Sequence, residues 1–244
     1  MRYELYYWPT IQGRGEFVRL ALEEGGADYL DVARLPEGDG MGMPALLRFL
    51  DDAVLEHAPF APPFLKAGER LIGQTANILL YLGPRLGLGP KTEVDRHWAH
   101  QLQLTIADLV TEVHDAHHPI SGGLYYEDQK PEAQRRAADF TRNRLPKFLR
   151  HFEQARSRNS FRSGYMVADS LSCADLSIFQ LIEGLRYAYP RTMSRLEPGC
   201  PGLVELHARV SARPRIAAYL ASARRLPFSE EGIFRHYPEL DPQD

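Results

Sequence analysis

The chain has 244 residues, of which 44% are hydrophobic and 25% charged, and its formal net charge is −3. This composition is typical of a globular protein that buries a substantial core, and the slightly acidic charge excludes a protein devoted to nucleic acid or anionic membranes. No apolar run approaches the roughly 20 residues that a membrane-spanning helix needs, so we expect neither nucleic acid nor membrane as a partner.

Targeting and redox signals favour the cytoplasm. The first residues, MRYELYYWP, lack the apolar segment and the small-residue cleavage site of a secretory signal. Cys173 and Cys200 are the only cysteines, so no disulfide framework is expected and a reducing compartment suits the chain. We therefore expect a cytoplasmic protein.

The N-terminal third of the chain mixes short strands with helices. Side chains alternate between two faces in "YELYYW" from Tyr3, which predicts a strand. A helix is predicted from about Arg14 to Glu24, ended by Gly25-Gly26, and "DYLDVARL" predicts a second strand. After an irregular stretch rich in Gly and Pro, "PPFLKAGERLIG" predicts two strands around a turn, and "QTANILLYLGPRLGL" predicts a helix. A βαβ unit followed by ββα is the thioredoxin-like arrangement.

The rest of the chain shows only helical periodicity. Helices are predicted at roughly 93–118, 131–157, 172–187, 202–211 and 214–224. Ser172 and Asp175 form a short variant of the capping box at the start of one of them. The predicted fold class is therefore an α+β, thioredoxin-like N-terminal domain followed by an all-α helical domain. We expect the first domain at 1–83, a linker at 84–92, the helical domain at 93–225 and a tail at 226–244.

Four segments, in the same order as in the family, resemble the cytosolic glutathione transferases, most closely the pi, mu and sigma classes. They are "LYYWPTIQGRGEFVRLAL", "PPFLKAGERLIGQTANILLYLG", "LSCADLSIFQLIEGL" and "SARPRIAAYLAS". The resemblance covers most of the chain. It implies an enzyme that uses glutathione as co-substrate, bound mainly to the first domain, a small apolar electrophile bound by the helical domain, and a symmetric homodimer.

Tyr7 is the residue on which the expected chemistry depends. A thiol attacks electrophiles as its thiolate, and a free thiol has a pKa of about 8.5. A hydrogen-bond donor near the sulfur favours the anion, and a tyrosine hydroxyl, with its pKa near ~10, stays protonated and can donate. The resemblance places the family's catalytic tyrosine at Tyr7. Strand alternation turns Tyr6 the opposite way, and the alternative is that Tyr7 is only a core aromatic residue.

The resemblance also implies a set of glutathione-binding residues. Arg14 corresponds to an arginine that contacts the carboxylate end of the peptide. Gln74 and Thr75 correspond to the pair that receives the γ-glutamyl group, and backbone N–H groups at a helix start suit an anion. Thr75 is alternatively a simple helix N-cap. Pro63 has the spacing of the family's cis-proline, and Pro62, which pairs with the cysteine of glutathione, offers only its carbonyl because proline lacks an N–H.

The chain departs from the family in three further places. The loop after Tyr7 is one residue longer, at Thr10-Ile11-Gln12, than in the pi or mu pattern. No tryptophan lies between the second and third strands, and the basic residues there, Arg48 and Lys66, have no assigned role. An acid supplied by the partner subunit has no clear match near Leu104-Thr105. Two alternatives therefore stay open: a non-catalytic glutathione-binding scaffold, and a glutathione-dependent isomerase or peroxidase.

Other chemistry is weighed and set aside. A thioredoxin-like redox protein carries C-x-x-C after its first strand, and this chain has none, so the sulfur must come from the ligand. His114, His117 and His118 cluster near a helix end, but no further ligand set is evident and no metal is expected. Some of these histidines are candidates for the electrophile pocket.

The tail is too aromatic for a disordered segment. Phe228, Ile233, Phe234 and Tyr237 lie among its charged residues. We expect the tail to fold back toward the cleft between the domains and to narrow the electrophile pocket.

Overall fold

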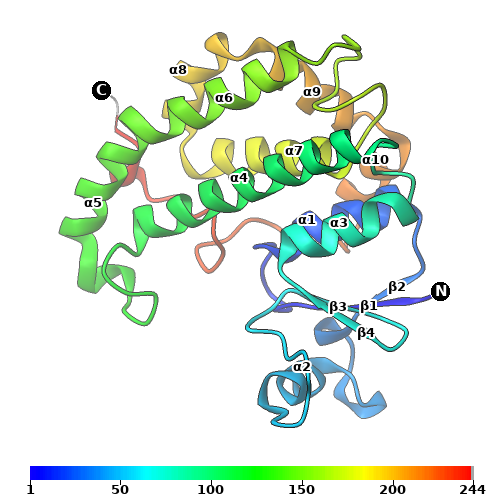
Figure 1. Cartoon of the computed structure of the whole chain (residues 1–244). Coiled ribbons are helices and arrows are strands. Elements are labelled where there is room, and N and C mark those ends of the chain that lie inside the picture. Colours follow the sequence, from blue (N-terminus) through cyan, green and yellow to red (C-terminus); the bar gives the residue numbers. More distant parts are fainter. Residues whose placement is uncertain (243–244) are drawn as a thin grey trace.

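The computed structural model describes residues 1–242. Four strands, β1 (Tyr3–Tyr6), β2 (Tyr29–Asp31), β3 (Phe64–Ala67) and β4 (Arg70–Gly73), form a sheet in the order β2-β1-β3-β4. β1 and β2 are parallel, whereas β3 pairs antiparallel with both β1 and β4. This topology confirms the predicted βαβ-ββα arrangement (Figure 1).

Helices cover both faces of this sheet. α1 (Gly15–Glu24) and α3 (Thr75–Arg85) lie between the sheet and the helical domain, and α2 (Gly42–Asp51) lies on the opposite face (Figure 1). The two faces bury separate clusters. The α1/α3 face buries Leu5, Val18, Leu22, Leu65, Ile78 and Leu82, and the α2 face buries Tyr6, Val32, Ala33, Ala45, Leu46 and Phe64.

α2 corrects a prediction, because its segment was interpreted as irregular. Gly42 and Pro44 gave the stretch its appearance of a loop, yet both lie in the first turn of the helix. Proline is tolerated there because the first N–H groups of a helix have no intrahelical partner. Ala45 and Leu46 then supply a buried apolar face.

The second part of the structure is helical, as predicted. Its helices are α4 (Glu93–His117), α5 (Lys130–Asp139), α6 (Leu145–Ser157), α7 (Cys173–Ala188), α8 (Pro190–Leu196), α9 (Pro201–Ser211) and α10 (Pro214–Leu220). A π-helical turn at Phe140–Arg144 divides the helix predicted at 131–157, and α8 was not predicted. Short 3₁₀ helices lie at Val32–Arg34, Glu37–Asp39, Tyr126–Gln129, Glu197–Gly199 and Pro238–Leu240.

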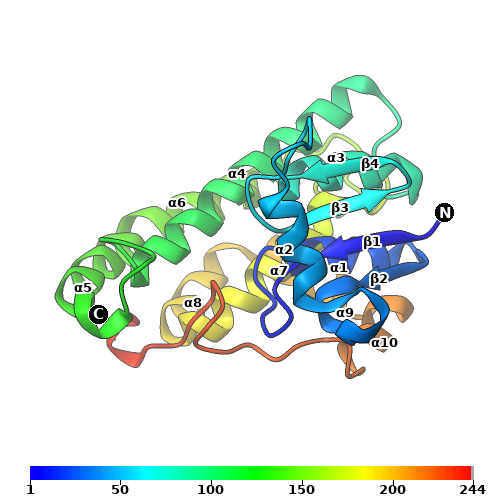
Figure 2. The same cartoon turned by 90° about the horizontal axis from the view of Figure 1, so that it is seen from below.

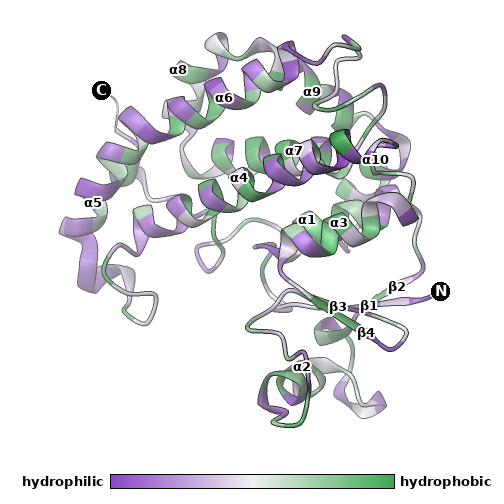
Figure 3. Ribbon diagram, in the orientation of Figure 1, coloured by the Kyte–Doolittle hydropathy of each residue, from purple (hydrophilic) through white to green (hydrophobic). Residues whose placement is uncertain are grey.

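α7 is the central helix of this domain. It is green along much of its length in Figure 3, whereas the outer helix α5 is largely purple. The predicted capping box is confirmed at its start. Both the N–H and the hydroxyl of Ser172 donate to Asp175 Oδ2 over 2.7 Å, and Asp175 is fully buried.

The C-terminal tail folds back, as expected, and packs on the helical domain; that it narrows the electrophile pocket stays a prediction. The ring of Phe228 stacks on Tyr187 with centroids 4.9 Å apart, and Phe234 packs so closely on Gly184 of α7 that a Cβ there would lie 2.4 Å from its ring. The tail then runs past α8 toward α5 (Figure 2). Near its end, the Asp241 carboxylate accepts from the backbone N–H of Thr192, on α8, over 3.0 Å. Within residues 1–242 no helix is both long and apolar enough to cross a membrane.

Candidate functional site

Tyr7 lies directly after β1 and points at the N-terminus of α1. The backbone N–H of Arg14 donates to the Tyr7 hydroxyl oxygen over 2.8 Å. Two glycines make this approach possible: a Cβ on Gly13 would lie 2.0 Å from that oxygen, and a Cβ on Gly15 would lie 2.5 Å from the ring. Gly13 also has a φ of 44°, a backbone conformation that residues with a side chain rarely adopt. Gly13 and Gly15 therefore leave the space that the phenol ring and its hydroxyl occupy.

The environment of Tyr7 keeps its phenol protonated. The side chain is 3% exposed. Burial raises the pKa of Tyr7, and the Arg14 N–H and the charges of Arg14 and Arg19 offset part of that effect. A neutral phenol at neutral pH is a hydrogen-bond donor.

Tyr6 lies on the other face of the sheet, as strand alternation predicted. Its hydroxyl donates to Glu4 over 2.6 Å, and its ring stacks on Phe64 with centroids 4.7 Å apart. Tyr6 is therefore a structural neighbour of α2, while Tyr7 faces α1.

A cavity of about 360 Å³ lies where α1, α3 and α4 meet. Arg14, Gln74 and Thr75 line it, together with His100 and Gln103 of α4. Its volume is at the lower end of the range for small-molecule sites. The structure thus gathers three of the residues named from the sequence around one cavity; Tyr7, Pro62 and Pro63 are not among its lining residues.

The start of α3 contributes Gln74 and Thr75 to this cavity. Gln74 has a φ of 68°, a conformation that a non-glycine residue keeps only when its surroundings hold it there. Gln74, not Thr75, is the N-cap, so the N-cap interpretation of Thr75 is wrong. Within the described part of the chain, Thr75 Oγ1 is buried without a hydrogen-bond partner. A buried hydroxyl without a partner is free to form a hydrogen bond with a bound ligand.

The peptide bond between Pro62 and Pro63 is cis, which confirms the position expected for the cis-proline. The two basic residues left without a role are engaged elsewhere. An Arg48 guanidinium nitrogen donates to the carbonyl of Gly40 over 3.2 Å, and the Lys66 ammonium lies 3.1 Å from the Glu4 carboxylate.

The sequence offers the histidines at the end of α4 as candidates for a pocket, but α4 lines the cavity through residues such as His100 and Gln103 instead. Gln103 is 5% exposed and donates to the hydroxyl of Ser177 over 3.0 Å. Among the described residues, His100 Nδ1 is buried and has no partner. The i,i+3 spacing of His100 and Gln103 puts both on one helix face. The sequence offered one signal for this role, which is the pair of polar residues on the helix face that packs against another domain.

The histidines at the end of α4 bind the tail and one another. His117 Nε2 lies 2.8 Å from the carbonyl of Ile233, and the Nδ1 atoms of His117 and His118 are in contact. Burial lowers the pKa of His117 to about 3. Over residues 1–242, no group of three His, Cys, Asp or Glu side chains is arranged to hold a metal ion.

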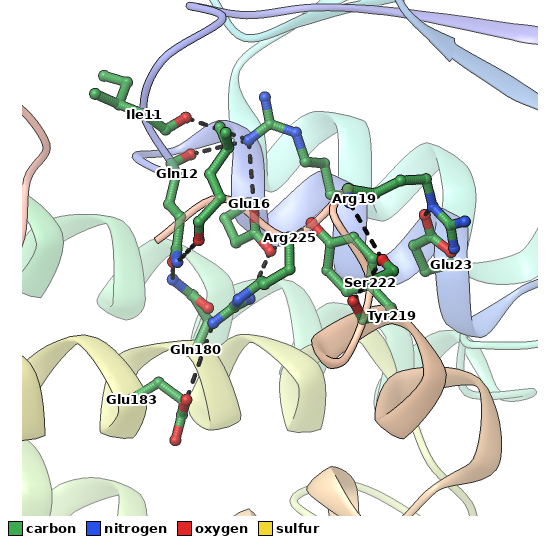
Figure 4. Close-up of polar contacts among 12 residues, drawn as sticks. Ile11, Gln12, Glu16, Arg19, Glu23, Gln180, Glu183, Tyr219, Ser222 and Arg225 are labelled. Carbon is green, nitrogen blue, oxygen red and sulfur yellow. Dashed lines mark hydrogen bonds and ion pairs between the residues drawn. The ribbon is translucent and has the colours of Figure 1, made fainter. Parts of the chain in front are cut away.

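A buried charge cluster supports the start of α1. Arg19 is fully buried and lies 2.7 Å from Asp31 and 3.3 Å from Glu16. Glu16 in turn accepts from the hydroxyl of Tyr219 over 2.7 Å and from Arg225 over 2.5 Å, both in the C-terminal part of the chain (Figure 4). Helix α1, which begins directly after the Arg14 that contacts Tyr7, is thus linked to the C-terminal part of the chain.

Comparison with known proteins agrees with this architecture. A family model described as "Glutathione S-transferase, C-terminal domain" matches residues 114–223. A glutathione S-transferase P of Pongo abelii is 30% identical over 179 residues, which cover 70% of this chain and 74% of that protein. A glutathione S-transferase of Plasmodium falciparum is 23% identical over 225 residues, which cover 90% and 95% of the two chains. The structure of an Onchocerca volvulus pi-class glutathione S-transferase matches with a TM-score of 0.70 and 20% identity, over 95% of this chain and 99% of that one.

The fold and the cavity are those of a protein with a thioredoxin-like domain, an all-helical domain and a site where the two meet. The relative that is 30% identical and matched over 74% of its length shows which family of such proteins this is. The chain belongs to the glutathione S-transferase family of enzymes.

Proposed function

We propose that the protein is a glutathione transferase in which the Tyr7 hydroxyl donates a hydrogen bond to the sulfur of glutathione. The observation that carries this proposal is the bond from the Arg14 N–H to the Tyr7 oxygen, over 2.8 Å. That bond uses a lone pair of the phenol and leaves its proton to donate. A donor at the sulfur lowers the pKa of the thiol and so raises the thiolate concentration at neutral pH.

Glutathione binds, in this proposal, along the cavity at the start of α3. The Thr75 hydroxyl and the helix N–H groups receive the γ-glutamyl carboxylate. Arg14 neutralises the carboxylate end of the peptide, and the Pro62 carbonyl accepts from the cysteine N–H. Two observations support this placement. Arg14, Gln74 and Thr75 line one cavity, and within residues 1–242 Thr75 Oγ1 is buried without a hydrogen-bond partner.

The reaction is nucleophilic attack of the thiolate on an apolar electrophile. The sulfur electron pair forms a bond to the electrophilic carbon. In a substitution the leaving group departs with the displaced electron pair; in an addition that pair moves onto the electron-withdrawing group of the electrophile, which then takes a proton from water. Residues 1–83 supply the glutathione site in this proposal, and residues 93–225 supply the electrophile pocket. The protein works in the cytoplasm.

A homodimer is part of the same proposal. Phe60 is 95% exposed and Val54 is 90% exposed, both in the segment that joins α2 to β3. The homodimer follows from the resemblance to the family, and these two exposed apolar side chains are available for contacts with a second chain. Sedimentation velocity tests this: one species at the mass of two chains is expected, and a single species at the mass of one chain would contradict it.

One observation favours a second candidate, a glutathione-binding scaffold without turnover. Pro62 lacks the N–H that would complete the pairing with glutathione, and Arg48 and Lys66 are engaged with other groups. Steady-state conjugation of a chromogenic electrophile separates the two. An enzyme turns over, and Tyr7→Phe lowers kcat/KM by roughly 10²-fold, whereas Tyr6→Phe, the matched loss of a neighbouring hydroxyl, changes it little. A scaffold binds glutathione and does not turn over.

A further inference from the structure

Gln12 ties the loop between β1 and α1 to the second domain. Its side chain is 4% exposed and donates to the carbonyl of Leu226 over 2.5 Å. It also accepts from the side-chain amide of Gln180, on α7, over 2.8 Å (Figure 4). One amide therefore joins the loop, the central helix and the start of the tail.

The main chain of Gln12 is held from the opposite side. Its carbonyl accepts from the N–H of Glu16 over 3.0 Å and from the Arg19 guanidinium over 3.3 Å. Arg19 is fully buried, and its guanidinium carbon lies 5.7 Å from the centre of the Tyr7 ring. Gln12 is thus fixed through both its backbone and its side chain.

The two residues that follow Gln12 are the ones that touch the phenol. Gly13 packs against the Tyr7 oxygen, and Arg14 donates its N–H to it. Since consecutive peptide units move together, a shift of Gln12 changes the distance between the Arg14 N–H and the Tyr7 oxygen.

We propose that Gln12 is a positioning residue for thiol activation. Its amide, held by Gln180 and Leu226, sets the contact between Arg14 and Tyr7 and thereby the acidity of the bound glutathione thiol. The inference rests on the proposed function of Tyr7. It gives the helical domain a part in activating the thiol as well as in binding the electrophile, and it assigns a use to one residue of the lengthened loop.

Three variants test it. Gln12→Met keeps the length of the side chain and removes its hydrogen bonds. Gln180→Met removes one of these bonds and leaves the loop sequence intact, so it carries the test if the loop variant does not fold. Gln129→Met is the matched control, because Gln129 is fully buried and its amide likewise holds a loop, through Ile120 N–H at 2.9 Å and Ser121 carbonyl at 3.0 Å.

The measurement is the ultraviolet absorbance of enzyme-bound glutathione thiolate as a function of pH, with Tm recorded alongside. Gln12→Met is expected to raise the apparent pKa of the bound thiol by about half a unit to one unit, which lowers kcat/KM by about three- to tenfold at pH values below the wild-type thiol pKa. Gln180→Met shifts it in the same direction by less. Gln129→Met lowers Tm without moving the thiol pKa.

Two different failures are distinguishable. If Tyr7→Phe raises the thiol pKa while Gln12→Met and Gln180→Met leave it at the wild-type value, Gln12 has only a structural role and this inference is rejected alone. If wild type and Tyr7→Phe titrate identically, the role of Tyr7 and the inference built on it are both rejected.

Discussion

The backbone N–H of Arg14 donates a hydrogen bond to the phenolic oxygen of Tyr7 over 2.8 Å. Because Tyr7 is 3% exposed and its pKa is raised by burial, the phenol is held neutral in one orientation. A preorganised donor stabilises a developing anion without reorganising, which is the main electrostatic device of enzymes. In the proposed site that anion is the sulfur of glutathione.

The Thr75 hydroxyl is expected to bind ligand rather than to stabilise the fold. Its oxygen is buried without a partner in the described part of the chain, so Thr75→Val removes no hydrogen bond from the free protein. We expect KM for glutathione to rise by about tenfold, the value of one lost hydrogen bond to a charged group, with Tm unchanged or higher. Steady-state kinetics and thermal unfolding measure the two quantities. A lower Tm with an unchanged KM would contradict the binding role.

Arg19 is expected to be a large contributor to stability. It is fully buried between Asp31 and Glu16, and Arg19→Met leaves both carboxylates without it. We expect the free energy of unfolding in urea to fall by about 3–5 kcal/mol. Arg2→Met is the control, because its ion pair with Asp28 is solvent-exposed and contributes at most about 1 kcal/mol. Equal losses in the two variants would show that burial does not matter here.

Neither cysteine is expected to react in the folded protein. Burial raises the pKa of Cys173 to about 12 and that of Cys200 to about 11, so both remain thiols at pH 8. A chromogenic disulfide reagent should label both sulfurs in denaturant and neither in buffer. Rapid labelling of a native thiol would show that the protein carries a reactive cysteine of its own.

Acid is expected to weaken the attachment of the tail through His117. Burial holds the pKa of His117 at about 3 in the folded protein, against about 6.5 in an unfolded chain, so between these values the unfolded state binds more protons and stability falls as pH falls. The hydrogen bond to the Ile233 carbonyl opposes this lowering of the pKa, whereas the charges of Arg235, His114 and His118 add to it.

The comparison for His117 is with His117→Gln, which cannot titrate. Between pH 6.5 and pH 5 the wild type should lose about 1–2 kcal/mol more free energy of unfolding than the variant. Chemical denaturation at each pH gives both curves. Parallel curves would contradict the assignment.

Local signals in the sequence predicted most of the fold. Strand alternation placed Tyr6 and Tyr7 on opposite faces, and the Ser172–Asp175 capping box marked the start of α7. The resemblance to the glutathione transferases, through the spacing of Pro63 and Gln74, located the cis bond and the start of α3. Each of these features is set by neighbours in the chain, so a single sequence carries it.

Features that depend on the second domain could not be predicted in this way. Gln12 was noticed only as one of three residues in a lengthened loop, because its partners Leu226 and Gln180 are more than half the chain away. Among the described residues, His100 Nδ1 is buried without a hydrogen-bond partner, and this burial likewise depends on how α4 packs against other elements. α2 was missed for a different reason: Gly42 and Pro44 are helix breakers in an interior turn and are tolerated in a first turn.

The most direct test of the proposed role of Tyr7 is a pH titration of the glutathione thiolate bound to wild type, Tyr7→Phe and Tyr6→Phe, followed by ultraviolet absorbance. We expect the wild type and Tyr6→Phe to hold the thiol at a pKa well below its free value of about 8.5, and Tyr7→Phe to raise it by about one unit or more. A wild-type thiol that titrates at its free value, or at the same value in Tyr7→Phe, would contradict activation by the Tyr7 hydroxyl.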